Sequence, residues 1–212
     1  MPQPDAALLF AAGFGTRMRP LTDTLPKPLV KVAGRPLFEH ALALVRDAGV
    51  GTVVANTHYH AALMAVHLAA SNVVESHEAT ILDTGGGLKA ALPLLSGDAV
   101  LTLNTDAVWT GPNPVAALLD AWDPNRMDGL MMLIPRESAV GHKGRGDFIP
   151  DASIGLFYST AAILALHRLR QSGRQDDVPR VTVAADNFAG CRRVPRLPRA
   201  RHRGQAARLW VR

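Results

Sequence analysis

Short apolar runs alternate with longer amphipathic stretches over the first two thirds of the chain. The apolar runs have the length and the β-branched content of buried strands, whereas the longer stretches repeat apolar residues at helical spacing. Strands that alternate with helices form βαβ units, which predicts an α/β fold with a mainly parallel sheet flanked by helices. The predicted strands cover residues 8–10, 50–56, 73–76, 99–103 and 129–134, and the predicted helices cover residues 36–48, 60–70, 88–95 and 114–122.

Three parts of this pattern carry more specific expectations. Helix 60–70 is expected to turn Leu63, Val66 and Ala70 toward the core. The glycine run 85–87 is expected to be a loop that leads into helix 88–95. Residues 154–169 are expected to form a strand and then a helix.

The pattern weakens near Pro150, and from Cys191 onward arginine alternates with proline, alanine and leucine without a clear period. We therefore predict one α/β domain over residues 1–148. Residues 149–212 are predicted to be a partly irregular, Arg-rich segment that packs poorly.

The composition is that of a globular protein, with 48% hydrophobic and 19% charged residues. Because Cys191 is the only cysteine, no disulfide can form within the chain, which fits a reducing compartment such as the cytoplasm. The apolar runs fall short of the roughly 18 residues that a membrane-spanning helix needs. No basic residue precedes the first apolar run, so neither a membrane span nor a signal peptide is expected.

The net charge of +5 comes from the end of the chain. That segment lacks the interleaved aromatic residues of a nucleic-acid-binding module, so no nucleic-acid partner is predicted. The arginines that account for the charge are Arg192, Arg193, Arg196, Arg199, Arg201, Arg203, Arg208 and Arg212.

A glycine turn follows the first strand, at Gly13 and Gly15. Glycines let backbone N–H groups approach a ligand closely, and such groups form anion-binding nests. Arg17 follows directly, and Lys27 stands between two prolines that keep its backbone extended. The dinucleotide-binding fingerprint fails because Met18 stands where a third glycine is needed, and no P-loop string occurs. The order of strand, glycines and cations therefore indicates a triphosphate site, the alternative being an ordinary strand-to-helix turn.

Asp106 closes the buried strand 99–103, at the sheet edge where α/β proteins bind ligands. A carboxylate facing a triphosphate is a suitable ligand for Mg²⁺, which commonly takes one or two carboxylates plus phosphate oxygens. The alternative is that Asp106 caps the following segment. Asn104 projects from the same side of the strand and is a candidate sugar contact. The glycine run 85–87 leaves room for a flat base, whose pyrimidine edge the backbone could bind.

The segment from Ala11 to Leu42 reads AAGFGTRMRPLTDTLPKPLVKVAGRPLFEHAL and resembles the signature of sugar-1-phosphate nucleotidyltransferases. Within that family the chain is most similar to the short bacterial N-acetylmuramate-1-phosphate uridylyltransferases. The resemblance continues through NTHYHAA, DTGGGLKAALPLL, LTLNTDAVWTG and GHKGRGDF, and covers residues 8–148.

The resemblance implies a Rossmann-like sheet and transfer of a uridylyl group from UTP to N-acetylmuramate 1-phosphate, with release of pyrophosphate, in cell-wall recycling. It implies that Mg²⁺ is the cofactor, that Asp106 binds it, and that Arg17 and Lys27 are catalytic. It also implies a sugar site at Asn104, Gly146 and Asp147. The nucleotide-binding residues that it implies are Ala11, Ala12, Gly13, Gly15, Thr16, Gly85 and Gly86.

Two alternatives stay open. Family members usually carry a late Trp-x-Asp-Val-Gly string with a second metal ligand, whereas this chain reads Leu209-Trp210-Val211-Arg212, so a weak or inactive nucleotide-binding homologue is one alternative. The other is a zinc-dependent hydrolase, since Thr57-His58-Tyr59-His60 partly matches a zinc-binding Thr-His-x-His motif. That motif would continue with Asp-His, but two alanines follow, and His67 falls at helical spacing. The oligomeric state is not predicted.

Overall fold

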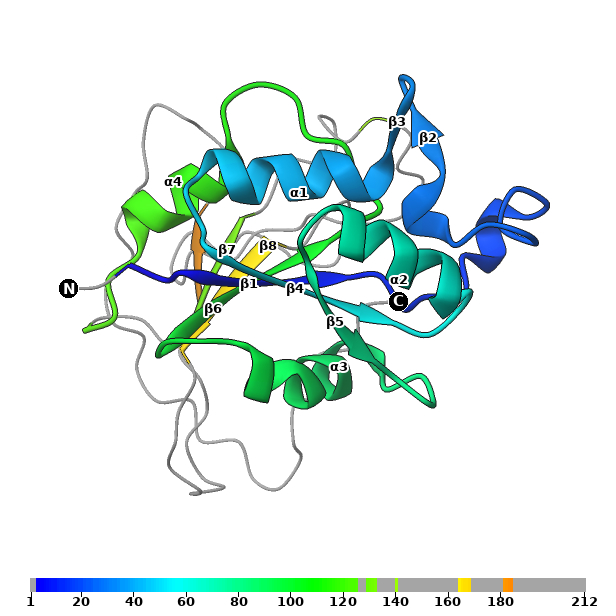
Figure 1. Cartoon of the computed structure of the whole chain (residues 1–212). Helices are drawn as coiled ribbons and strands as arrows, with labels where there is room; N and C mark the ends of the chain where they lie inside the picture. Colours follow the sequence, from blue (N-terminus) through cyan, green and yellow to red (C-terminus); the bar gives the residue numbers. More distant parts are fainter. Residues whose placement is uncertain (1–2, 126–128, 133–139, 141–163, 169–180, 185–212) are drawn as a thin grey trace, which may run out of the picture.

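The computed structural model describes residues 3–125, 129–132, 140, 164–168 and 181–184. Within these residues the main sheet has seven strands in the order β5-β4-β1-β6-β8-β7-β9 (Figure 1). The strands are β1 (Ala6–Phe10), β4 (Thr52–Thr57), β5 (Val74–His77), β6 (Ala99–Asn104), β7 (Gly129–Met132), β8 (Leu164–Arg168) and β9 (Val181–Ala184).

A small hairpin and several helices complete the described structure. The hairpin pairs β2 (Lys31–Val32) with β3 (Arg35–Pro36) in antiparallel fashion. The α-helices are α1 (Leu37–Asp47), α2 (Ala61–Ala70), α3 (Asp83–Ala91) and α4 (Pro114–Ala121). The 3₁₀ helices are η1 (Thr16–Met18), η2 (Lys27–Leu29) and η3 (Leu92–Leu94).

The strand pairings confirm the predicted α/β fold with a mainly parallel sheet. The neighbours β5, β4, β1 and β6 all run parallel, as do β7 and β9. Parallel strands end at the same edge, so the segments that follow β1, β4 and β6 meet there. This common edge is where the predicted site residues gather.

β8 corrects one expectation. The helix expected at the end of residues 154–169 is wrong, because residues 164–168 form a strand there. That strand lies between β6 and β7 and is antiparallel to both, so sheet hydrogen bonds outweigh the local helical spacing. β8 and β9 both lie beyond residue 148, so the sheet continues past the predicted domain boundary. The packing of residues 185–212 lies outside the described residues.

Helices cover both faces of the sheet, which explains why β1 reads as one continuous apolar run. Its side chains alternate between two cores. Ala7 and Leu9 join a cluster with residues of α1, α2 and α4, whereas Leu8 packs with Val54 and Ala91 on the face covered by α3. Figure 1 shows the same division, with α1 and α4 above the sheet and α3 below it.

The predicted inner face of the second helix is wrong. Met64 and Leu68 are buried in α2, whereas Leu63 and Val66 are 46% and 74% exposed. Ala70 is exposed as well. Because α2 reads AALMAVHLAA and is apolar nearly all round, its spacing cannot indicate which side faces the core.

The glycine run 85–87 is helical, whereas a loop was expected there. It lies inside α3, which begins at Asp83, and the predicted helix over residues 88–95 is split into the end of α3 and η3. Glycine is a poor helix former, by about 1 kcal/mol relative to alanine. Close packing outweighs that preference here, because a Cβ at Gly87 would lie 2.7 Å from Glu78 Oε1.

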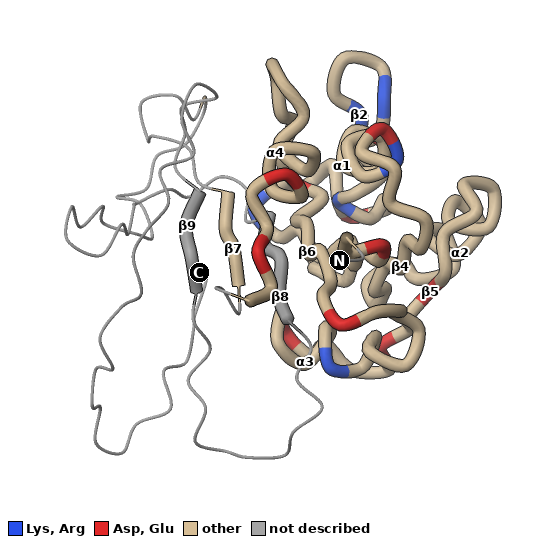
Figure 2. Tube along the Cα trace, turned by 90° about the vertical axis from the view of Figure 1, so that its left-hand side faces the viewer, with Lys and Arg blue, Asp and Glu red and all other residues tan. Residues whose placement is uncertain are grey.

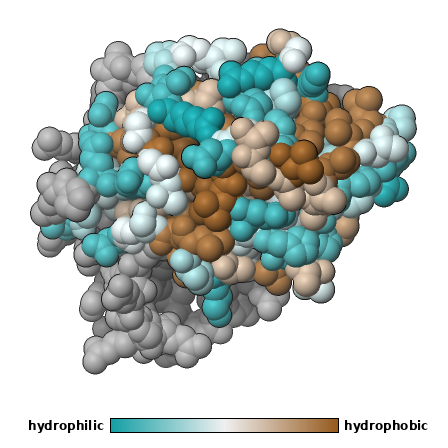
Figure 3. All heavy atoms as spheres, viewed as in Figure 1, coloured by the Kyte–Doolittle hydropathy of each residue, from teal (hydrophilic) through white to brown (hydrophobic). Residues whose placement is uncertain are grey.

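Among the described residues, no helix is long and apolar enough to cross a membrane. Acidic and basic residues are interspersed along the described part of the chain (Figure 2). The exposed apolar side chains include Val66 and Val74. On the face drawn in Figure 3, hydrophobic surface gathers across the middle and is bordered by hydrophilic residues.

Candidate active site

The glycine turn begins where β1 ends and has two unlike glycines. Gly15 has φ +62°, and a Cβ there would lie 2.9 Å from both Lys27 Cβ and Thr22 Cγ2. Gly13 has no atom within 4 Å of its own Cβ position, so it borders open space. Ala11 and Ala12 are buried just before the turn, at 3% and 4% exposure. The turn is therefore closed at Gly15 and accessible at Gly13.

Two predicted site residues from distant parts of the chain bind each other. Lys27 Nζ donates to Asp106 Oδ2 at 2.6 Å, across 79 positions of sequence. The two side chains are 22% and 36% exposed, so the pair remains open to solvent and to ligands. An anion near the glycine turn would meet the lysine, and a cation would meet the carboxylate.

Arg17 and Thr16 lie on η1, directly after the glycine turn. Both are exposed, and Arg17 makes no hydrogen bond or ion pair with any other described residue. Its guanidinium is thus available to an anion at the turn, as the sequence predicts.

The ends of β6 and β1 are joined beside this pair. Asn104 is the last residue of β6 and lies in register with Phe10, the last residue of β1. Thr105 Oγ1 donates to the Phe10 carbonyl at 2.7 Å. This bond fixes the two strand ends relative to each other, and so fixes Asp106 relative to the glycine turn.

A buried network links β1 to α3. Asn56 Oδ1 accepts a hydrogen bond from Ala11 N at 2.7 Å, and Asn56 Nδ2 donates to Glu78 Oε1 at 2.8 Å. The other oxygen of Glu78 accepts from Leu82 N at 2.9 Å, just before α3 begins. Asn56 and Glu78 are only 4% and 2% exposed, so these bonds form in a dry environment where each is costly to lose.

The three glycines of α3 differ in what surrounds them. Gly85 is exposed and has nothing within 4 Å of its Cβ position. A Cβ at Gly86 would lie 2.8 Å from Leu82 Cβ, and one at Gly87 would collide with the two atoms of the Asn56–Glu78 bond. Only Gly85 of the three therefore offers its backbone to a ligand without a contact from the protein.

The structure thus brings together most of the predicted site. Gly15, Lys27 and Asp106 form a connected set, and the Ala11 backbone is tied to α3 through Asn56 and Glu78. The predicted sugar contacts Gly146 and Asp147 lie outside the described residues, so that prediction stays untested.

Four residues that organise this edge were not predicted as site residues: Thr22, Asn56, Tyr59 and Glu78. Asn56 and Glu78 carried a weak signal, since each is a polar residue at or just after the end of a short apolar run. Thr22 and Tyr59 carried none. The Tyr59 hydroxyl reaches a carbonyl 37 positions away, and the Thr22 hydroxyl reaches the Gly15 carbonyl only because the chain folds back on itself.

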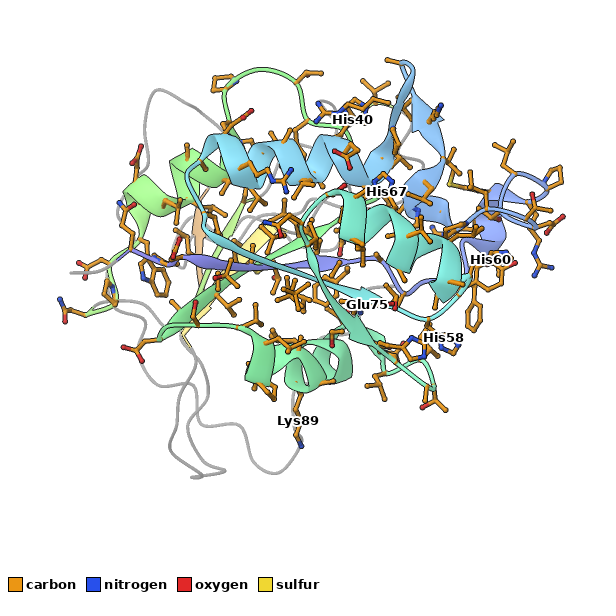
Figure 4. The ribbon with its side chains drawn as sticks, viewed as in Figure 1. His40, His58, His60, His67, Glu75 and Lys89 are labelled. Carbon is orange, nitrogen blue, oxygen red and sulfur yellow. The ribbon has the colours of Figure 1, made fainter. Side chains whose placement is uncertain are left out.

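The zinc alternative receives no support from the histidine geometry. His58 Nδ1 contacts the Glu78 carbonyl, His60 Nε2 contacts the Asp23 carbonyl, and His67 Nε2 contacts Glu39 Oε1. Figure 4 shows His67 on α2, away from His58. The described residues contain no group of three or more His, Cys, Asp or Glu side chains that could hold a metal ion.

A pocket of about 510 Å³ lies elsewhere, between the segment before β2 and α2. None of the predicted site residues lines it. Its lining residues are Leu21, Leu25, Leu29, Val30, Lys31, Pro36 and His67.

Comparisons with known proteins agree with the geometry. The chain is 42% identical over 154 residues to the N-acetylmuramate alpha-1-phosphate uridylyltransferase of Caulobacter vibrioides, a match that covers 68% of this chain and 64% of the relative. It is 39% identical over 160 residues to the protein of the same name from Neisseria meningitidis serogroup B, covering 70% of this chain and 66% of the relative. The chain therefore spans just under two thirds of the length of these curated relatives.

Solved structures show the same fold. HddC from Yersinia pseudotuberculosis, complexed with GMP-PN, superposes with a TM-score of 0.65 over 85% of this chain and 90% of that protein, at 15% identity. The family model for the MobA-like NTP transferase domain matches residues 7–187. This chain therefore belongs to the MobA-like NTP transferases, a family of nucleotidyltransferases.

Proposed function

We propose that this chain transfers a uridylyl group from UTP to N-acetylmuramate 1-phosphate and releases pyrophosphate. The observation that carries the proposal is the meeting of the glycine turn, Lys27 and Asp106 at the carboxyl edge of the sheet. The substrate and the base come from the names of the two relatives at about 40% identity.

The reaction needs positioning and charge stabilisation more than acid–base chemistry. An oxygen of the sugar phosphate, already anionic, attacks the α-phosphorus of UTP in line, and pyrophosphate leaves. The backbone around Gly13, with the side chains of Arg17 and Lys27, would hold the phosphates and balance their charge. The proposed place of the uracil is the accessible backbone of Gly85, with Ala11 and Ala12 on its other side.

Asp106 is a suitable ligand for Mg²⁺. Its carboxylate is partly exposed, and only one of its oxygens has a partner among the described residues. Mg²⁺ commonly binds through one or two carboxylates and the phosphates of the substrate. When bound, the ion would polarise phosphate oxygens and orient them. Asn104, the last residue of β6, is the proposed sugar contact.

The test is pyrophosphate release by the full chain with UTP and N-acetylmuramate 1-phosphate in the presence of Mg²⁺. CTP, GTP and ATP, and the 1-phosphates of glucose and mannose, replace the substrates one at a time. We expect turnover that is fastest with UTP and the N-acetylmuramate ester. Turnover with another pair would refute the substrate assignment, and UTP binding without turnover would support the inactive-homologue alternative.

Variants of the two cations test the phosphate site. Lys27→Ala and Arg17→Ala should each remove a charge-assisted hydrogen bond of ~1.5–3 kcal/mol, which weakens UTP binding about 10- to 100-fold. Lys31→Ala is the matched control, because this exposed lysine lies on β2 and forms no ion pair with Asp106. Equal UTP affinity in all three variants would contradict the assignment of the triphosphate site.

A further inference from the structure

Three consecutive residues after β4 contact the segment that contains the glycine turn. His58, Tyr59 and His60 belong to the partial zinc-binding motif of the sequence, and the proposed reaction gives none of them a role. We call these three residues the brace. Figure 4 places His58 and His60 at the end of the molecule where β4 gives way to α2.

The central contact of the brace is made by Tyr59. Its hydroxyl donates to the Thr22 carbonyl at 3.0 Å. Thr22 is completely buried, and its own hydroxyl donates to the Gly15 carbonyl at 2.9 Å. One residue therefore connects Tyr59 to the glycine that has the left-handed backbone and no room for a side chain.

Ring contacts hold the outer side of the turn. The ring of Phe14 meets the rings of His58 and Tyr59 edge-on, with centroids 5.5 Å and 5.6 Å apart. Phe14 lies between Gly13 and Gly15 and is 42% exposed, so these rings are its anchor. Aromatic pairs of this geometry contribute about 0.5–1.5 kcal/mol beyond their buried area.

The two histidines extend the brace to both sides. His60 Nε2 contacts the Asp23 carbonyl at 3.2 Å, and its ring lies 4.0 Å from that of Tyr59. His58 Nδ1 contacts the Glu78 carbonyl at 2.8 Å, beside the buried network that leads to α3. The brace thus connects the glycine turn to the segment on which the uracil site is proposed.

A glycine-rich turn needs such support. Gly13 and Gly15 have the largest backbone freedom of any residue, and ordering them costs about 1–2 kcal/mol each. If that cost fell at the moment of ligand binding, affinity for the triphosphate would drop. Apart from the three residues of η1, the turn has no regular structure of its own to hold it.

We propose that the brace preorganises the glycine turn for the triphosphate, with Tyr59 as its main positioning residue. This proposal rests on the proposed function, because it assumes that the turn binds UTP. Tyr59 acts through Thr22 on Gly15 and does not itself contact the phosphates.

Tyr59→Phe in the full chain is the first test, since it removes the hydroxyl and keeps the ring that contacts Phe14. We expect the dissociation constant of UTP, measured by calorimetry, to rise about three- to tenfold, the effect of losing one neutral hydrogen bond. Under native conditions and without nucleotide, trypsin should cut the bond after Arg17 faster in Tyr59→Phe than in the wild type, as followed by mass spectrometry. Tyr59→Leu should show a larger change in both measurements, because it also removes the ring contact.

His60→Asn and His40→Asn form a matched pair of controls. Each removes a contact between a histidine Nε2 and a backbone carbonyl, but His40 contacts Val32 in the β2–β3 hairpin. Asparagine suits the left-handed backbone of His60, at φ +52°. We expect His60→Asn to weaken UTP binding and to speed cleavage after Arg17, and His40→Asn to leave both unchanged.

Wild-type UTP affinity and wild-type cleavage in Tyr59→Phe would overturn the proposal. Equal effects of His60→Asn and His40→Asn on UTP binding and on cleavage would also overturn it. So would faster cleavage of His60→Asn that is fully explained by a melting temperature lower than that of His40→Asn. The cleavage assay needs no nucleotide, so it tests the ordering of the glycine turn by the brace separately from the proposed uridylyl transfer. If the wild-type protein bound no UTP, the proposed function would fail, whereas faster cleavage in Tyr59→Phe would still show that the brace orders the turn.

Discussion

The glycine turn after β1 and the glycine run in α3 use the same residue type for different physical reasons. Gly15 needs glycine because its φ of +62° lies in the left-handed region and because Lys27 and Thr22 leave no space. None of the glycines in α3 has a positive φ, and Gly87 needs glycine only because Asn56 and Glu78 lie so close. Each region also has one glycine, Gly13 or Gly85, that faces open space. A glycine-rich sequence alone therefore does not tell which positions shape the backbone, which admit a neighbour and which face a ligand.

Gly15→Ala should have the largest effect in this comparison. It combines a left-handed backbone, which costs about 1–2 kcal/mol for alanine, with overpacking, which costs about 1–3 kcal/mol. We expect the free energy of unfolding to fall by about 2–5 kcal/mol and UTP binding to be lost, as measured by urea denaturation and calorimetry. Gly13→Ala is the control and should keep wild-type stability. A stable Gly15→Ala protein would show that the turn adapts.

Gly87→Ala should be the next largest. The new methyl group would push against the buried Asn56–Glu78 bond, and weakening that bond costs about 1–3 kcal/mol. The better helix propensity of alanine offsets up to about 1 kcal/mol of this. We therefore expect a net loss of about 1–2 kcal/mol in urea denaturation. No loss of stability would mean that the Glu78 side chain moves aside freely.

Gly85→Ala should have the smallest effect on stability, and with the opposite sign. Because nothing lies near its Cβ position, alanine should stabilise α3 by up to about 1 kcal/mol. The same methyl group would enter the proposed uracil site, so UTP affinity should fall while the melting temperature rises. Higher stability with unchanged UTP affinity would contradict the proposed position of the uracil at Gly85.

Much of the fold could be predicted from the sequence, because the signals were local. β1, β4 and β6 are short, apolar and buried on both faces, and a buried run of that kind is visible in the sequence alone. The face of α2 could not be predicted, since Leu63 and Met64 are both apolar and only the packing of α2 against β4 and β5 decides which one is buried. The position of β8 between β6 and β7 depends on pairing with strands more than 30 positions away.

The site divides in the same way. Gly13, Gly15, Lys27 and Asp106 stand at strand ends or in a recognisable order, so the sequence alone predicts them as site residues. Thr22 and Tyr59 each act through a single hydrogen bond to a backbone carbonyl, and Glu78 joins the Asn56 side chain to Leu82 N. These contacts form only once the chain is folded. A threonine before a loop or a tyrosine after a strand has no local feature that distinguishes it from many others.

The ion pair between Lys27 and Asp106 makes each of these groups the counter-ion of the other. In the proposed reaction, a triphosphate that takes the lysine would leave an unbalanced carboxylate beside its own negative charge. A cation that takes the carboxylate would likewise leave an unbalanced ammonium group. The cation would balance the carboxylate that the triphosphate leaves without its lysine, and the triphosphate would balance the ammonium group that the cation leaves without its carboxylate. Two ligands that compensate each other in this way bind with positive coupling. The pair thus favours the nucleotide and its cation arriving together over either one alone.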